Sequence, residues 1–303
     1  MKALIASVVI AMSLGVAMLG PFGDVTAGDK PAEAEKPAAL WQSAAQSQEG
    51  FAQPNLGLAY NSGKTAPSDF SEVVRWHKLA AAQGDAVAQN KRGVMYYLGR
   101  GVSQDFAEAA RWWRAAANQG HANTRFNLGN IYTEGQGELQ NYAEAVRWFK
   151  LAAAQEHAGA QFNLGIMYFH GYGTEQSFSE ALRLYRLAAA QSDPDAQFNL
   201  GNMYYHGQGT PKDYAQAMRW YKLAAAQGDV SAQNNLGYMY SEGHGVQKNS
   251  VQAHLWFNLA ATQGNADAMN NREIIATKMT PQQIAKAQKM ARECLASNYE
   301  KCD

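Results

Sequence analysis

The residue types that carry out catalysis are present in this 303-residue chain, but not at the spacing that catalysis needs. The sequence contains no Ser-x-x-Lys, Gly-x-Ser-x-Gly or His-Glu-x-x-His motif, each of which places a nucleophile or a metal ligand beside its partner. The triplet Gly63-Lys64-Thr65 has Leu58 where a phosphate-binding loop requires its first glycine. We therefore predict a protein with no catalytic residues and no cofactor.

The seven histidines do not form a metal-binding pattern. His121 and His157 stand 36 residues apart, at a position where aspartate or asparagine recurs elsewhere, and we expect both to cap helices. His170 and His206 also stand 36 residues apart. Packed helices lie ~10 Å apart whereas metal ligands lie ~2 Å from the ion, so this pair predicts no metal site. The other histidines have no partner at a meaningful spacing: His77, His244 and His254.

The only two cysteines, Cys294 and Cys302, lie near the C-terminus. Two cysteines exclude a disulfide-dense scaffold and a four-cysteine zinc site. On one helix they would be ~12 Å apart, so a disulfide requires the chain to turn back after about Ser297. In an oxidising compartment we expect that bridge, which stabilises the fold by about 2.5 kcal/mol. The alternative is a pair of separate thiols.

The first 27 residues have the parts of an export signal. Lys2 gives a positive start, Ala3 to Leu19 is an uninterrupted apolar or small run, and Val25-Thr26-Ala27 offers the small residues that signal peptidase reads. We expect residues 1–27 to be a signal peptide cleaved after Ala27, which places the mature chain in the periplasm or outside the cell. The alternative is an uncleaved anchor, because the apolar segment approaches the ~20 residues of a membrane span.

Composition and charge exclude two further classes of protein. The 26 Lys and Arg balance 26 Asp and Glu, which argues against a nucleic-acid binder. The mean hydropathy of −0.41 excludes a polytopic membrane protein, so we expect no membrane insertion of the mature chain unless the N-terminal segment is kept. Residues 28–49, with Pro31 and Pro37 among alternating acidic and basic residues, predict a flexible tether.

A period of 36 residues organises the rest of the chain. Six glycines and six tyrosines recur at that step: Gly57, Gly93, Gly129, Gly165, Gly201, Gly237 and Tyr60, Tyr96, Tyr132, Tyr168, Tyr204, Tyr240. A regular spacing of this length is typical of a solenoid of two-helix units. We expect a first helix, helix A, at residues 86–97 and a second, helix B, at 106–119, with copies every 36 residues.

Cap residues mark the start of both helices. Helix A is preceded by one column of capping residues: Asp85, His121, His157, Asp193, Asp229 and Asn265. Helix B is preceded by another: Asp69, Asp105, Asn141, Ser177, Asp213 and Asn249. Each residue of the second column is followed three places later by Glu or Gln, which predicts six capping boxes. Gly93 lies inside helix A, where glycine costs about 1 kcal/mol, and we interpret it as a packing glycine.

The repeat resembles a known family. Residues 160–168 (AQFNLGIMY), Gly171-Tyr172-Gly173, residues 177–181 (SFSEA) and residues 188–190 (AAA) resemble the Sel1-like repeat, a relative of the tetratricopeptide repeat. The resemblance implies an all-α, right-handed α/α solenoid with six repeats at residues 50–265. Residues 266–303 are then capping helices that carry the cysteine pair, with Thr280-Pro281 beginning the last helix.

The related tetratricopeptide fold uses the concave face of its A helices for binding, and the resemblance carries that role to four variable columns of helix A. Helical geometry independently places steps of 4, 3 and 1 residues on one face. The predicted partner-binding residues are Tyr97, Phe126, Asn130, Phe162, Ile166, Phe169, His170, Phe198, Asn202, Tyr205, His206 and Tyr238. Flat rings with amide and histidine edges suit a protein or peptide partner.

Two structural interpretations stand beside this one. The rings of Phe126, Phe162 and Phe198 can instead pack against neighbouring A helices, which would leave a thinner and more polar groove. A strictly recurring amide column is expected to bridge repeats rather than to hold a ligand: Asn127, Asn163, Asn199 and Asn235.

The resemblance implies a non-catalytic, monomeric scaffold or adaptor of the bacterial envelope that binds a protein or peptide. A second function comes from cysteine-rich secreted members of the same family, which are associated with penicillin binding and weak β-lactamase activity. The Cys294-x7-Cys302 spacing resembles theirs, although no activated serine accompanies it here.

Overall fold

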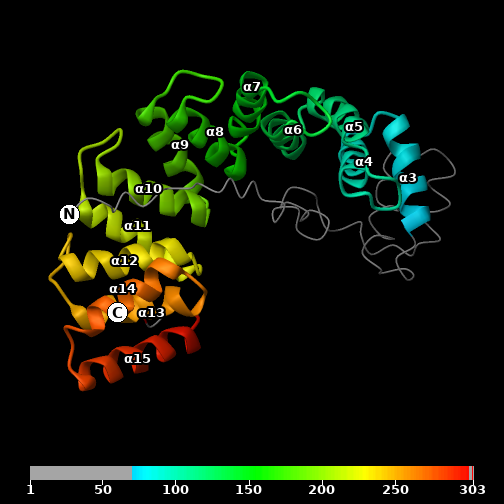
Figure 1. Cartoon of the computed structure of the whole chain (residues 1–303). Coiled ribbons are helices and arrows are strands. Elements are labelled where there is room, and N and C mark those ends of the chain that lie inside the picture. Colours follow the sequence, from blue (N-terminus) through cyan, green and yellow to red (C-terminus); the bar gives the residue numbers. More distant parts are fainter. Residues whose placement is uncertain (1–69, 300–301, 303) are drawn as a thin grey trace, which may run out of the picture. The chain divides into compact units, whose positions relative to one another are not determined.

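The computed structural model describes residues 70–299 and residue 302, and every regular element in these residues is an α-helix (Figure 1). The helices are α3 (Phe70–Ala82), α4 (Ala86–Leu98), α5 (Phe106–Asn118), α6 (Ala122–Glu134), α7 (Tyr142–Ala153), α8 (Ala158–His170), α9 (Phe178–Ala190), α10 (Pro194–His206), α11 (Tyr214–Ala226), α12 (Val230–Glu242), α13 (Ser250–Thr262), α14 (Ala266–Ala276) and α15 (Pro281–Ala296). The predicted signal peptide, the predicted tether and the predicted cap Asp69 lie outside the described residues.

The chain divides into two compact units, residues 1–140 and 141–303. The described part of the first contains α3 to α6, and that of the second contains α7 to α15. Within the units, helix A packs on the helix B that follows it in four hairpins: α4 on α5, α8 on α9, α10 on α11 and α12 on α13. Each helix B then packs on the next helix A of its unit, as α5 does on α6 and α9 on α10. The predicted all-α solenoid of two-helix repeats is confirmed.

The predicted caps of helix A are confirmed. Asp85 accepts a hydrogen bond from the backbone N–H of Ala88 at 2.7 Å, and the equivalent aspartates and asparagine do the same in α10, α12 and α14. His157 caps α8 through Nδ1, which accepts from the backbone N–H of Ala160 at 3.1 Å. His121 caps α6 in the same way. Each helix A from α4 to α12 ends at a glycine in the left-handed conformation, such as Gly171 with φ 74°. Glycine is the usual residue at this position of a helix end.

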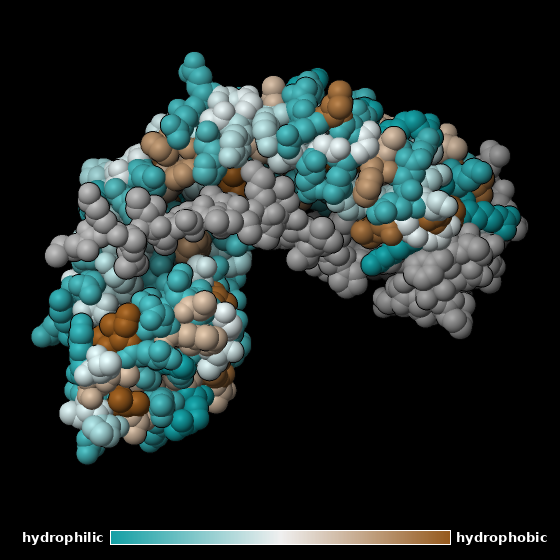
Figure 2. All heavy atoms as spheres, viewed as in Figure 1, coloured by the Kyte–Doolittle hydropathy of each residue, from teal (hydrophilic) through white to brown (hydrophobic). Residues whose placement is uncertain are grey.

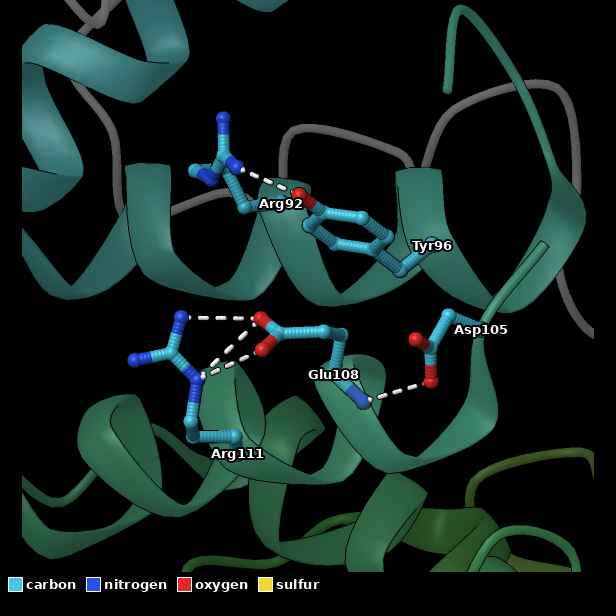
Figure 3. Close-up of polar contacts among 5 residues, drawn as sticks. All are labelled: Arg92, Tyr96, Asp105, Glu108 and Arg111. Carbon is cyan, nitrogen blue, oxygen red and sulfur yellow. Dashed lines mark hydrogen bonds and ion pairs between the residues drawn. The ribbon is translucent and has the colours of Figure 1, made fainter. Parts of the chain in front are cut away.

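The predicted capping boxes of helix B are half right. Asp105 accepts from the backbone N–H of Glu108 at 3.0 Å, but the Glu108 carboxylate pairs forward with Arg111 at 2.8 Å (Figure 3). Forward pairs also form in two other repeats: Arg147 with Glu144 and Arg183 with Glu180. A charged partner makes a stronger hydrogen bond than a backbone N–H does. Among the described helices only α15 has both halves of the box, from Thr280 and Gln283.

The glycine column of helix A is a packing column, as predicted. A Cβ at Gly165 would lie 2.6 Å from the ring of Tyr185, and a Cβ at Gly201 would lie 2.6 Å from that of Tyr221. Both tyrosines are fully buried on the helix B of the same hairpin. Helices A and B can therefore approach only where this position lacks a side chain.

Arg92 takes the place of the leucine that the other repeats have at this position, and it is buried. Its guanidinium donates to the hydroxyl of Tyr96 at 3.0 Å (Figure 3) and lies 4.8 Å from the ring centroid of Trp112. These aromatic contacts compensate the charge, so the departure from the repeat pattern does not break the helix pair.

Buried glutamines link successive repeats. Gln191 Nε2 donates to Gln161 Oε1 at 2.8 Å, and Gln161 Nε2 donates to the carbonyl of Ala153 at 3.4 Å. The same amide pair recurs in three other places: Gln119 with Gln89, Gln227 with Gln197, and Gln263 with Gln233. This ladder of amides fixes the register between hairpins.

The C-terminal helices cap the solenoid. The helix α15 packs on α13, and Cys294 on α15 forms a disulfide with Cys302. As predicted, the chain turns back after Ser297, where Asn298 and Tyr299 both have positive φ. Ala287 and Ala291 of α15 are buried, whereas Leu295 is 43% exposed.

Candidate partner-binding surface

The predicted partner-binding residues occupy equivalent positions on the A helices of both units, and we call them the helix-A stripe. In the first unit it consists of Tyr97 on α4 and of Phe126 and Asn130 on α6. In the second unit it runs over α8, α10 and α12 and consists of Phe162, Ile166, Phe169, His170, Phe198, Asn202, Tyr205, His206 and Tyr238. Since the two units are separate bodies, each part of the stripe is a surface of its own.

Most of the helix-A stripe is partly exposed, which is what a binding surface requires. His206 and Tyr238 are exposed, with Tyr238 at 39% of its full surface, and the other rings are half-buried. Ile166 differs, because it is only 9% exposed and belongs to a hydrophobic core cluster. Its assignment as a partner-binding residue is therefore corrected to a packing role.

The phenylalanines near the start of α8 and α10 pack on their own hairpins. The ring of Phe162 lies 5.7 Å from that of Tyr185 on α9, and the ring of Phe198 lies 5.9 Å from that of Tyr221 on α11. Both phenylalanines remain partly exposed. The alternative interpretation expected contacts with neighbouring A helices, whereas these ring contacts are with helix B of the same hairpin.

Further along the helices the rings are fixed by helix B and by neighbours on the stripe. The ring of Phe169 lies 5.1 Å from that of Phe178 and 5.0 Å from that of His170, in both cases edge to face. Tyr205 lies 5.1 Å from Tyr214 on α11. In the first unit Tyr97 contacts the rings of two α5 residues, Phe106 and Trp113. Such contacts hold a ring in place before a partner arrives, which lowers the entropy lost on binding.

His244 belongs to this surface, although the spacing of the histidines gave it no partner. It lies in the loop after α12, stacks on Tyr214 at 4.6 Å with an interplanar angle of 4°, and its Nδ1 is 2.9 Å from the hydroxyl of Tyr205. The sequence did contain a hint of this contact. Tyr172 occupies the equivalent loop position two repeats earlier, and its ring stacks on that of Tyr142 at 5.1 Å. Reading the column across repeats would have linked both loop rings to helix B.

The helix-A stripe of the second unit carries little charge at neutral pH. Burial lowers the pKa of His170, and burial together with the Lys212 ammonium lowers the pKa of His206. Burial also raises the pKa of the Tyr205 phenol, with a further contribution from Tyr238. The histidines are therefore neutral and the tyrosine remains a phenol, so the stripe offers apolar contact and neutral hydrogen bonds.

The amides of the region serve mainly the fold. Asn202 Oδ1 accepts from the Tyr221 hydroxyl at 2.6 Å and from Asn235 Nδ2 at 3.4 Å. The second bond joins adjacent repeats and confirms the predicted bridging role for Asn235. Asn199 instead donates to the carbonyl of Asp195 within its own helix at 2.8 Å, so the bridging prediction is wrong there.

Among the described residues, no group of three or more His, Cys, Asp or Glu could hold a metal ion. No helix in the described part of the chain has the length and apolar character to cross a membrane. On the face drawn in Figure 2, hydrophobic residues form separate patches among hydrophilic ones.

Comparison with known proteins agrees with the repeat pattern. The Sel1 repeat family matches six segments of the chain: residues 51–85, 86–121, 123–157, 158–193, 194–229 and 230–265. A Sel1 repeat protein from Oxalobacter formigenes is 31% identical over 79% of this chain and 96% of its own, with a TM-score of 0.68. A protective antigen of uropathogenic Escherichia coli, which displays an SLR fold, is 25% identical over 88% of this chain and 80% of its own, with a TM-score of 0.47. No curated protein matches the sequence.

Proposed function

The chain belongs to the Sel1 repeat family, and from this premise we propose that it is a scaffold of the bacterial envelope that binds a protein or peptide on the helix-A stripe. Sel1 repeat proteins are generally protein-interaction scaffolds and are typically non-catalytic. The partner, the monomeric state and the location in the envelope are parts of the proposal. The disulfide between Cys294 and Cys302 supports export, because disulfides form and persist in oxidising compartments.

One observation carries the binding role. On α8 and α10 the rings of Phe169 and Tyr205 contact helix-B rings, and both side chains remain partly exposed. Aromatic side chains fixed in this way provide contact area at a low entropic cost. Their neutral surroundings favour a partner segment with apolar side chains over a strongly charged one.

The test removes the two rings and measures capture of partners. Envelopes that contain the wild-type chain or the Phe169→Ala/Tyr205→Ala variant are crosslinked, and the proteins bound to each are identified. We expect the variant to lose at least about three quarters of the specific partner signal, since each ring contributes on the order of 1–2 kcal/mol. Helicity and melting temperature should stay nearly the same.

A matched control separates the stripe from general surface loss. Leu139, in the loop before α7, is 91% exposed and lies outside the stripe, so Leu139→Ala should capture partners as the wild type does. Tyr205→Phe keeps the ring and removes only the bond to His244, and it should retain most of the capture. Equal capture by the wild type and the folded double variant would reject the helix-A stripe as the binding surface.

The penicillin-binding alternative rests on the cysteine pair alone. Both sulfurs are held in a buried disulfide that fastens the chain end to α15, a purely structural use. Nitrocefin hydrolysis by the purified chain is the direct measurement, and turnover above a buffer control would restore that function.

A further inference from the structure

A row of leucines marks the B helices of the second unit on a surface separate from the helix-A stripe. Leu151 on α7, Leu187 on α9 and Leu223 on α11 stand 36 residues apart and are 38%, 42% and 42% exposed. We call these three residues the outer leucine row. A single exposed leucine needs no explanation, but three in register on adjacent repeats form a continuous feature.

The fourth member of the same column shows what can cover such a leucine. Leu259 on α13 follows Leu223 by 36 residues and is completely buried. The helix α15 packs on α13 (Figure 1), and Leu259 shares a core cluster with Ala291 and Cys294 of α15. In the last repeat, therefore, an amphipathic helix occupies the face that is open on α7, α9 and α11.

The charges around the column change where α15 lies. On α13 the two flanking positions are Leu255, which is fully buried, and Asn258. On the three open helices the same positions carry a cation each: Arg147 and Lys150, Arg183 and Arg186, Arg219 and Lys222. The chain thus has apolar or neutral flanks where its own helix docks, and positive flanks where none does.

Several of the cations are held against the protein rather than extended into water. Arg183 pairs with Glu180 at 3.0 Å, Arg186 donates to the Tyr204 hydroxyl at 2.5 Å, and the Lys150 ammonium lies 5.5 Å from the ring centroid of Tyr168. Glu144 and Glu180 offset part of the charge of Arg147 and Arg183. The positive charge beside the leucines therefore comes mainly from the cations that contact aromatic rings, which are Lys150, Arg186 and Arg219.

A hollow accompanies the row. Beside Leu151 a shallow cavity of about 560 Å³ is lined by Ala143, Val146 and, from the next loop, Gly173 and Thr174. The cations Arg147 and Lys150 line the same cavity, so apolar and positively charged surface lie side by side beside Leu151.

We propose that the outer leucine row is the docking site of an amphipathic helix from a partner protein whose polar flanks are acidic. Its apolar ridge lies across the three leucines, and its carboxylates meet the flanking cations. Side chains seven residues apart lie on one face of a helix, about 10.5 Å apart along its axis, so leucines at that spacing form a single apolar ridge. The site is independent of the helix-A stripe.

Charge distinguishes this partner from two other occupants. The helix α15 of a second copy exposes Lys286, Lys289 and Arg292, so it would be repelled by the same cations. An anionic membrane would meet the charges, but the hollow beside Leu151 and the burial of Leu259 by a helix favour a helical ligand.

The experiment uses three labelled synthetic helices of about 21 residues with leucine at every seventh position. One has glutamate flanks, the second has lysine flanks, and the third has the glutamate composition in scrambled order. Binding to the full chain is measured by fluorescence anisotropy at low and moderate salt. We expect only the ordered glutamate helix to bind, with weaker binding as salt rises.

Variants locate the binding. The Leu151→Ser/Leu187→Ser/Leu223→Ser protein should bind the glutamate helix at least about tenfold more weakly, because burial of apolar surface is lost. Arg219→Glu should weaken binding of the same helix and improve that of the lysine helix. Leu139→Ser is the matched control for an exposed leucine outside the row, and it should bind as the wild type does.

Three results would overturn the proposal. These are equal binding of the glutamate helix to the wild type and to the folded triple serine variant, equal binding of the glutamate and lysine helices, and no binding of any helix while phosphatidylglycerol vesicles bind in a leucine-dependent way. The last result would identify the row as a membrane-contact surface. A wild-type melting temperature of the triple variant is the check on folding.

Discussion

At the turn between helix B and the next helix A, two repeats have a non-glycine residue with positive φ, which costs conformational free energy. Between helix B and the next helix A, most repeats place glycine at positive φ, as in Gly228 with φ 87°. Two repeats instead place Glu156 and Ser192 there, with φ of 61° and 66°. A left-handed conformation costs a non-glycine residue about 1–2 kcal/mol, so both side chains sit at strained positions.

The strain predicts opposite effects of two exchanges at equivalent positions. Ser192→Gly should raise the free energy of unfolding by about 0.5–1 kcal/mol, which is the relieved strain less the greater entropy that glycine gives the unfolded chain. Gly228→Ser should lower it by a similar amount, although a Cβ at Gly228 meets no atom within 4 Å. Urea denaturation of both variants measures the difference. A lower stability of Ser192→Gly would show that the serine side chain contributes more than its backbone strain costs.

For the individual helices, cap residues and glycines predicted where each helix begins and ends. Contacts between residues far apart in the sequence were not predicted. The boundaries of α4 and α5 agree with the predicted ones to within a residue, because caps such as Asp85 and glycines such as Gly99 act within a few residues of the chain. The stacking of His244 on Tyr214 and the bond from Gln161 to the carbonyl of Ala153 both join residues of successive repeats. Such pairs depend on the register between repeats, which no single segment contains.

The candidate site was predictable to the same extent. The period placed Phe169 and Tyr205 in equivalent positions on the stripe, and helical geometry brought their neighbours to the same face. The sequence alone could not predict that Ile166 would be buried while Tyr238 stays 39% exposed. That difference depends on which side chains the adjacent hairpin places opposite each residue.

A side chain introduced at the packing glycine should push helix A and helix B of the hairpin apart. Gly165→Val should lower the free energy of unfolding by about 1–3 kcal/mol, because its Cβ would lie 2.6 Å from the buried ring of Tyr185. Thermal denaturation measures the loss. The combination with Tyr185→Ala should be less unstable than the sum of the two single changes, since the small side chain makes room for the valine. Strictly additive losses would exclude close packing as the reason for the glycine.

In this solenoid each helix contacts mainly its nearest neighbours, so a local loss of stability should affect the adjacent helices first. From α3 to α6 and from α7 to α14 each helix packs on its neighbours in the sequence, and α15 packs on α13. The stability of such an array is approximately a sum of repeat terms and nearest-neighbour terms. A lesion at the C-terminal end should therefore weaken the adjacent helices first.

Removal of the disulfide tests this expectation directly. In the Cys294→Ala/Cys302→Ala variant the chain after Ser297 is no longer fastened to α15, and the cap loses about 2–3 kcal/mol of stabilisation. Amide hydrogen exchange should accelerate most in α15, less in α13 and α14, and hardly at all in α3 to α6, which belong to the other unit. Alanine fills most of the space of a buried cysteine, so exchange of the wild type under reducing conditions provides a matched control without any change of side chain. Uniform acceleration from α3 to α15 would mean that the chain unfolds as one cooperative body, and the nearest-neighbour account of its stability would then be wrong.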